Sequence, residues 1–194
     1  TNGQTYSFAI VAYNRKDEQE ISYPSNIIAD TPRPDITTVA LKSASTNQVT
    51  GDDSKAGFDF DTFTVVSVPA AGYVNDNSAD LINEAFDPGS GGNIRTWIAG
   101  MNGAGLQDLG YMDDLDGADI APERGYSEEG KSIAVLAGHV YAVKTGENNF
   151  GKIIITNIGG APDYAITFNA AFQLQTGNHN YKTVPMSYQL GLKQ

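Results

Sequence analysis

The sequence lacks cysteine entirely among its 194 residues, which excludes disulfide bridges, thiolate metal sites and cysteine nucleophiles. Histidine is almost as rare. Only His139 and His179 occur, without the short spacing of a zinc site, and no Ser-His-Asp order of a hydrolase can be recognised around them. Paired catalytic carboxylates stay an open alternative, because their separation is set in three dimensions. We predict a protein that is not an enzyme.

Basic residues are also few, with 12 Lys and Arg against 23 Asp and Glu, and the formal net charge is −11. Binding to nucleic acid needs clustered basic side chains for the phosphates, so we predict no nucleic-acid partner. Electrostatic docking on anionic membranes is disfavoured for the same reason. The acidic balance is compatible with a cation or with a neutral ligand such as a glycan.

No apolar window reaches about 18 residues, so we predict no transmembrane segment. No basic region followed by an apolar region opens the chain, and we therefore expect no signal peptide in this form. Because the first residue is threonine rather than methionine, we expect a mature or cleaved product.

Glycine, tyrosine and phenylalanine are abundant, at 21, 10 and 8 residues, and this composition favours strands and turns. The strongest pattern is Ser132–Gln175, where Gly146–Gly151 and Gly159–Asp163 separate three runs rich in β-branched and aromatic residues. Short breaks predict an antiparallel meander. Its third run alternates with a period of two, as half-buried strands do, and its apolar face comprises Ile166, Phe168, Ala170, Phe172 and Leu174. We predict an all-β protein built on an antiparallel β-sandwich or curled sheet.

One short helix is expected in that fold, at Ala79–Phe86, where the apolar residues have helical spacing. Asn77-Ser78 would cap it, and Asp87-Pro88-Gly89 would end it. Strands are predicted at Phe58–Pro69 and at Ile94–Met101. At the end of the chain, the run YKTVPMSYQLGL is predicted to form an edge strand.

The chain divides into three parts: a hairpin at 1–34, a linker at 35–57 and a β-rich domain at 58–194. Thr5–Asn14 and Ile21–Ala29 are the predicted hairpin strands, and the prolines of Thr31–Pro34 make a stiff exit. Asp35–Gly57 is polar and is interpreted as linker or surface loop, with a short strand where Ile36, Val39 and Leu41 fall.

The N-terminal sequences NGQTYSFAIVAYN (Asn2–Asn14) and SYPSN (Ser22–Asn26) resemble the last two strands of a fibronectin type III module. The five upstream strands of such a module are absent, and an isolated hairpin is marginally stable in water. Either an upstream part was lost, or the hairpin packs on the main domain or adds to a neighbouring subunit. Alternatively, it is the first hairpin of a single β domain. Strand addition predicts a homo-oligomer or filament in which Tyr6, Phe8 and Ile10 become buried.

The most suggestive polar cluster is a glycine-containing loop with four carboxylates, at Asp113, Asp114, Asp116 and Asp119. Calcium prefers several oxygen ligands on such a flexible loop, so these four are candidate calcium ligands. The spacing of an EF-hand and its bidentate glutamate are missing. The alternative interpretation is a solvated acidic loop with no metal.

A second resemblance runs from Phe58 to Gln175. The strand sequences GHVYAVK (Gly138–Lys144), GKIII (Gly151–Ile155) and AITF (Ala165–Phe168) resemble the HmuY-like family of bacterial secreted and surface lipoproteins, some of which bind haem. The resemblance implies a β-rich fold and a surface location. Haem would need axial His or Met ligands, and none of the candidates matches a recognised position; they are His139, His179, Met101, Met112 and Met186.

We therefore expect an extracellular or cell-surface module from a bacterium or archaeon, with a structural or assembly role, for example as the subunit of a surface filament. The alternative is a secreted module that binds a ligand, either a carbohydrate or haem. In that alternative, Trp97 and Tyr111 would line the groove. Without a ligand-binding role, Trp97 is interpreted as a core residue.

Overall fold

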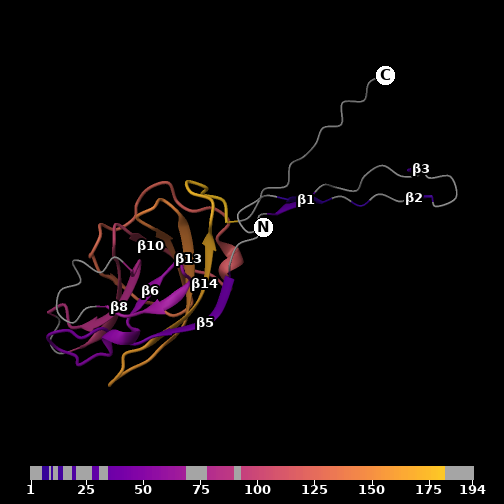
Figure 1. Ribbon diagram of the computed structural model, residues 1–194. Helices are drawn as coiled ribbons and strands as arrows, with labels where there is room; N and C mark the ends of the chain where they lie inside the picture. The colour runs from indigo at the N-terminus through magenta and orange to yellow at the C-terminus, as the bar shows by residue number, and fades with distance from the viewer. Residues whose placement is uncertain are drawn as a thin grey trace.

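The computed structural model describes residues 6–8, 10, 13–14, 19–20, 28–30, 35–68, 78–89 and 93–181. The fold is all-β, as predicted, and its main body consists of two antiparallel five-stranded sheets (Figure 1). Sheet I has the order β10-β12-β13-β14-β5. Its strands are β5 (Asp35–Leu41), β10 (Gly105–Tyr111), β12 (His139–Lys144), β13 (Phe150–Ile158) and β14 (Ile166–Gln173).

Sheet II has the order β11-β9-β8-β6-β7. Its strands are β6 (Gly57–Asp59), β7 (Thr64–Val66), β8 (Leu81–Phe86), β9 (Arg95–Gly100) and β11 (Ile133–Ala134). Two short 3-10 helices, η1 (Asp53–Lys55) and η2 (Leu115–Gly117), lie in the connections.

The core fills the space between the two sheets, and its aromatic rings join them. The ring of Phe58 from sheet II meets Phe168 of sheet I edge-on, with centroids 5.5 Å apart, and Phe60 lies at the same distance from Phe172. Such aromatic pairs contribute about 0.5–1.5 kcal/mol beyond the burial of their area. These aromatic contacts therefore link sheet I and sheet II across the core.

The predicted meander is confirmed as β12, β13 and β14, which pair in sequence order within sheet I. The alternating face of β14 lies in the core, while Leu174 follows the end of the strand and is 40% exposed. Strand β13 is buried on both faces, because Ile153 and Ile155 face the core while Ile154 packs beneath the loop that contains η2.

The predicted helix at Ala79–Phe86 is wrong, since β8 occupies Leu81–Phe86 and pairs with β9 along its whole length. Leu81 enters the central core, whereas Ile82 packs on the outer side of sheet II with Val68 and Ala99. A strand covered on both faces presents a continuous apolar run, which periodicity alone does not distinguish from a helix.

The interpretation of 35–57 as a linker is also wrong for its first residues, although the short strand expected there is confirmed. Strand β5 forms an edge of sheet I by pairing with β14, and Leu41 is fully buried. Beyond β5, the backbone N–H of Ala44 donates to the carbonyl of Asn83 at 2.7 Å. This segment therefore belongs to the β-rich domain, because its apolar residues complete the core.

The N-terminal strands form ladders of their own. β1 (Tyr6–Phe8) pairs antiparallel with β4 (Ile28–Asp30), and β2 (Tyr13–Asn14) pairs with β3 (Gln19–Glu20). Figure 1 shows β1, β2 and β3 away from the two large sheets. The boundary predicted near Pro34 and the edge strand predicted after Tyr181 lie outside the described residues.

Candidate functional site

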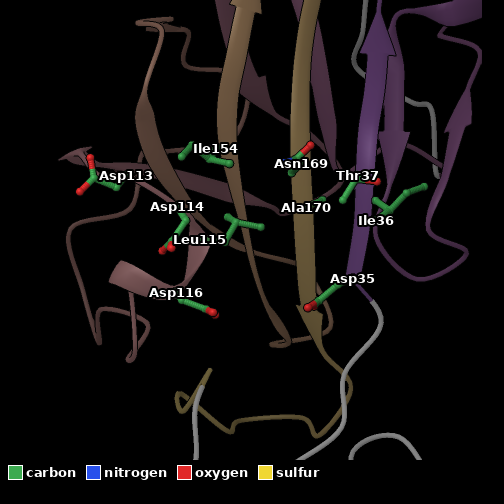
Figure 2. Close-up of a pocket in the computed structure, with 10 residues that line it drawn as sticks. All are labelled: Asp35, Ile36, Thr37, Asp113, Asp114, Leu115, Asp116, Ile154, Asn169 and Ala170. Atoms are coloured by element: carbon green, nitrogen blue, oxygen red, sulfur yellow. The ribbon is translucent and has the colours of Figure 1, made fainter.

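A groove of about 260 Å³ lies on the outer side of sheet I, between the edge strand β5 and the loop that carries η2. Figure 2 shows Asp114, Leu115 and Asp116 on one side, with Asp35, Ile36 and Thr37 of β5 opposite them. Ile154, Asn169 and Ala170, together with Asp113, complete the lining. The groove is smaller than the roughly 300–1,000 Å³ of pockets for drug-sized ligands, so it suits a few side chains better than a whole cofactor.

A β-bulge shapes the wall of the groove formed by β5. The register shifts between Phe168 and Ala170 of β14, and Thr38 of β5 has φ of 65°. This left-handed conformation is unfavourable for a β-branched residue. The Oδ1 atom of Asn169 accepts a hydrogen bond from the N–H of Thr38 at 2.9 Å, which supports the bulge.

The opposite wall is held by a buried lysine. Lys152 of β13 is fully buried, and its Nζ atom donates to the carbonyls of Leu115 and of Ala118, the latter at 2.7 Å. The ammonium also lies 4.8 Å from the ring centre of Tyr181, a cation–π contact. The acidic loop is thus folded around a positive charge from the protein itself, because its carbonyls point at the ammonium.

The candidate calcium ligands Asp113, Asp114, Asp116 and Asp119 lie in this loop, and all four are exposed. The Oδ1 atom of Asp114 accepts a hydrogen bond from the N–H of Gly117 at 3.0 Å and caps η2. Within the residues that the structure describes, no group of three or more acidic or histidine side chains is arranged to hold a metal ion. Calcium binding stays a prediction for this loop.

The structure places the two candidate ligand-binding aromatics in different sheets. Trp97 of β9 in sheet II is half-buried; its ring stacks on Phe86, with centroids 5.2 Å apart, and its Nε1 donates to the Phe86 carbonyl. Tyr111 ends β10 in sheet I and is 71% exposed. Its ring lies against the backbone of Gly138, where an added Cβ would come within 2.5 Å of a ring carbon.

Beside Tyr111, His139 and Asp108 form a partly exposed pair, with Nδ1 of the imidazole 3.0 Å from a carboxylate oxygen. The other histidine, His179, lies on the ring of Phe150 at 4.1 Å and has its Nδ1 3.2 Å from the Ala121 carbonyl. Of the methionines proposed for haem, Met101 packs outside sheet II and Met112 beneath the η2 loop, while Met186 lies outside the described residues. Haem binding stays a prediction.

Asp80 is the acidic residue that sequence reasoning missed. It is 3% exposed, directly precedes β8, and accepts a hydrogen bond from the N–H of Phe60 at 2.8 Å. Burial raises its pKa to about 7, and the nearby carboxylates of Asp61, Asp59 and Glu147 add to this effect. Asp59 itself caps the turn after β6 by accepting from the N–H of Asp61.

Glu84 of β8 is also buried, and burial raises its pKa although Ser132 donates a hydrogen bond to it. Neither Asp80 nor Glu84 lines the groove beside β5. Strongly perturbed acids mark catalytic sites when they lie in a cleft. Asp80 directly precedes β8 and Glu84 lies within it, so both belong to sheet II and its connections.

No protein-family model matches the sequence, and a search of curated proteins finds no significant match. In the part of the chain that is described, no helix has the length and apolar character needed to cross a membrane.

Proposed function

We propose that the protein is a non-enzymatic structural module of the bacterial or archaeal cell surface, and that it assembles through its N-terminal hairpin. The observation that carries the proposal is the separate pairing of this hairpin. Among the described residues, β1 pairs with β4 and β2 with β3, and neither ladder joins one of the five-stranded sheets. A two-stranded ladder gains stability when another strand or a packed face is added to it.

Strand addition from a neighbouring subunit would supply that partner. An exposed strand edge binds an extended segment through backbone hydrogen bonds, and alternate side chains provide specificity. Ile10, which follows β1, is 80% exposed in the single chain. We place it, with Tyr6 and Phe8, at the contact between subunits. Repetition of this contact along one direction would produce a filament.

The test is the oligomeric state of the full chain, measured by light scattering across a range of protein concentrations. Ile10→Lys is expected to weaken association at least about tenfold, because an ammonium would replace an apolar contact. The matched control is Ile120→Lys, since Ile120 is another exposed isoleucine, 59% exposed, on the β-rich domain. A monomer at all concentrations, or equal weakening by both substitutions, would contradict the proposal.

The exposed ring of Tyr111 favours a second candidate, a carbohydrate-binding surface. Aromatic faces stack on sugar rings, and the neighbouring Asp108–His139 pair offers hydrogen-bonding groups within the same strand pair. Titration with oligosaccharides, followed by calorimetry, is expected to give binding that Tyr111→Ala abolishes and that Ile120→Lys leaves intact. Binding unaffected by Tyr111→Ala would refute the assignment to this surface.

A further inference from the structure

We infer that the turn between β6 and β7, residues 60–63, is a pH-sensitive latch at one end of the core. The latch is closed while the buried carboxyl group of Asp80 is protonated, and it opens locally when that group ionises. Asp80 directly precedes β8, so the titrating group and the turn that moves belong to different segments. The inference does not rest on the N-terminal hairpin or on the proposed assembly.

A hydrogen bond joins the 60–63 turn to Asp80. The N–H of Phe60 donates to the Oδ2 atom of the carboxyl group at 2.8 Å. Asp80 is itself fixed through its backbone, because its N–H donates to the Phe58 carbonyl and its carbonyl accepts from the N–H of Met101, both at 3.0 Å. The residue is only 3% exposed. Ionisation therefore either leaves a charge buried or requires a movement that admits water.

Among the described residues, the charged groups that act on Asp80 are all acidic. Asp59 ends β6, Asp61 lies in the turn, and Glu147 lies in the connection between β12 and β13. Within that same part of the chain, none of these four carboxylates forms an ion pair with a basic side chain. The connection at residues 101–104, which bonds to the Asp80 carbonyl, contributes no charged side chain. Ionisation of Asp80 thus adds a further negative charge to an acidic cluster.

The 60–63 turn also contains backbone strain that favours its opening. Phe63 has φ of 58°, in the left-handed region that is unfavourable for a bulky side chain. Its ring packs against those of Phe58 and Phe172, with centroids 5.5 and 6.5 Å away, and these contacts hold the conformation in the closed state. When the hydrogen bond between Phe60 and Asp80 breaks, the turn can move and release this strain.

The direction of the pH effect follows from linkage. Burial raises the pKa of Asp80 to about 7 in the closed state, opposed by the hydrogen bond from Phe60 and assisted by the three neighbouring carboxylates. In an open state that exposes the carboxyl group to water, its pKa returns toward the ordinary 3.8. The closed state is therefore favoured at low pH. Opening becomes up to about tenfold more frequent for each pH unit between about pH 4 and 7, and it levels off above pH 7.

Amide hydrogen exchange of the ¹⁵N-labelled full chain, followed by NMR at pH 5, 6, 7 and 8, tests the latch. The intrinsic exchange rate of each amide is divided by its measured rate to give a protection factor. We expect the protection factor of the Phe60 amide to fall about 10- to 100-fold from pH 5 to pH 8, mostly below pH 7. The reference is the Thr38 amide, which donates to the Asn169 side chain, an acceptor that does not titrate.

The Ile153 amide separates local opening from unfolding of the whole domain, which ionisation of Asp80 also promotes. Ile153 is fully buried at the centre of sheet I, so its amide exchanges only when the domain unfolds. At pH 8 we expect the protection factor of Phe60 to be at least about tenfold below that of Ile153. Equal protection of these two amides at every pH would overturn the inference, because the turn would then open only with the domain.

Asp80→Asn identifies the titrating group, because asparagine keeps an oxygen that can accept from Phe60 but carries no charge. We expect the protection factor of Phe60 in this variant to change less than about twofold between pH 5 and 8. The matched control is Glu129→Gln, which neutralises an exposed acid of another loop and should retain the full decrease. A decrease that persists in Asp80→Asn would overturn the inference. So would a protection factor in the unmodified protein that stays constant or rises with pH, whether or not the variant folds.

Discussion

Replacing Asp80 by asparagine is expected to stabilise the protein at pH 8 and to have little effect near pH 4. Asp80 is 3% exposed, and burial raises its pKa from the ordinary 3.8 to about 7. Between about pH 4 and 7, the carboxyl group of Asp80 is therefore protonated in the folded state and ionised in the unfolded state. Since the folded pKa is the higher one, stability is greatest at low pH and declines as pH rises through this window.

The magnitude follows from the two pKa values of 3.8 and about 7. Each pKa unit corresponds to about 1.4 kcal/mol, so the ionised carboxylate lowers the free energy of unfolding by on the order of 4 kcal/mol at pH 8. Asparagine keeps an oxygen that can accept the hydrogen bond from Phe60 and removes the charge. We expect it to recover about 2–4 kcal/mol at pH 8, part being lost to accommodation of its amide NH₂ group.

Urea unfolding at pH 4, 6 and 8, followed by the fluorescence of Trp97, the only tryptophan, measures this effect. The control is Glu129→Gln, which neutralises an exposed acid and should leave the pH profile nearly unchanged. The reasoning would be refuted by a pH profile of Asp80→Asn that still declines as steeply as that of the unmodified protein. Destabilisation at pH 8 would refute it equally.

Three further predictions concern packing. Lys152→Met should cost about 2–4 kcal/mol, because two carbonyls of the η2 loop lose their donor, and limited proteolysis should then cut this loop faster than in the unmodified protein. Gly138→Ala should destabilise by more than Gly89→Ala in thermal unfolding: both glycines have positive φ, but only at Gly138 would the new Cβ meet the ring of Tyr111. Phe58→Ala should cost about 3–5 kcal/mol in urea unfolding, because it leaves a cavity between the sheets, and a loss below 1 kcal/mol would contradict the described core.

The sequence predicts best where one face of a strand is buried and the other is not. In β14, the alternation of Phe168 and Phe172 with polar residues reports the core directly. In β8, by contrast, Leu81 and Ile82 are both buried, on opposite sides of sheet II, and the alternation disappears. Periodicity then depends on which other segments cover the strand, and this is a tertiary property.

Strands are also difficult to predict in polar segments, because their burial depends on which other segments cover them. The polar segment 35–57 is interpreted as a linker with only a short strand, because only Val39 and Leu41 are buried in β5, near its C-terminal end. The groove beside β5 is formed by segments far apart in the chain, so the acidic loop can be predicted from the sequence but the wall opposite it cannot. Lys152, within a run of apolar residues, was the available signal that the outer side of β13 is covered by a polar structure.

The position of Lys152 also specifies how β13 aligns with its neighbours. Gly151 lies against the ring of Phe60, where even a Cβ would come within 2.5 Å of a ring carbon. A shift of the strand by one residue would exchange its two faces and drive the ammonium of Lys152 into the space between the sheets, far from the carbonyls that now accept its hydrogen bonds. Burial of an unpaired charge costs several kcal/mol. Gly151 on the core face of β13 and Lys152 on its outer face therefore both disfavour a register shifted by one residue.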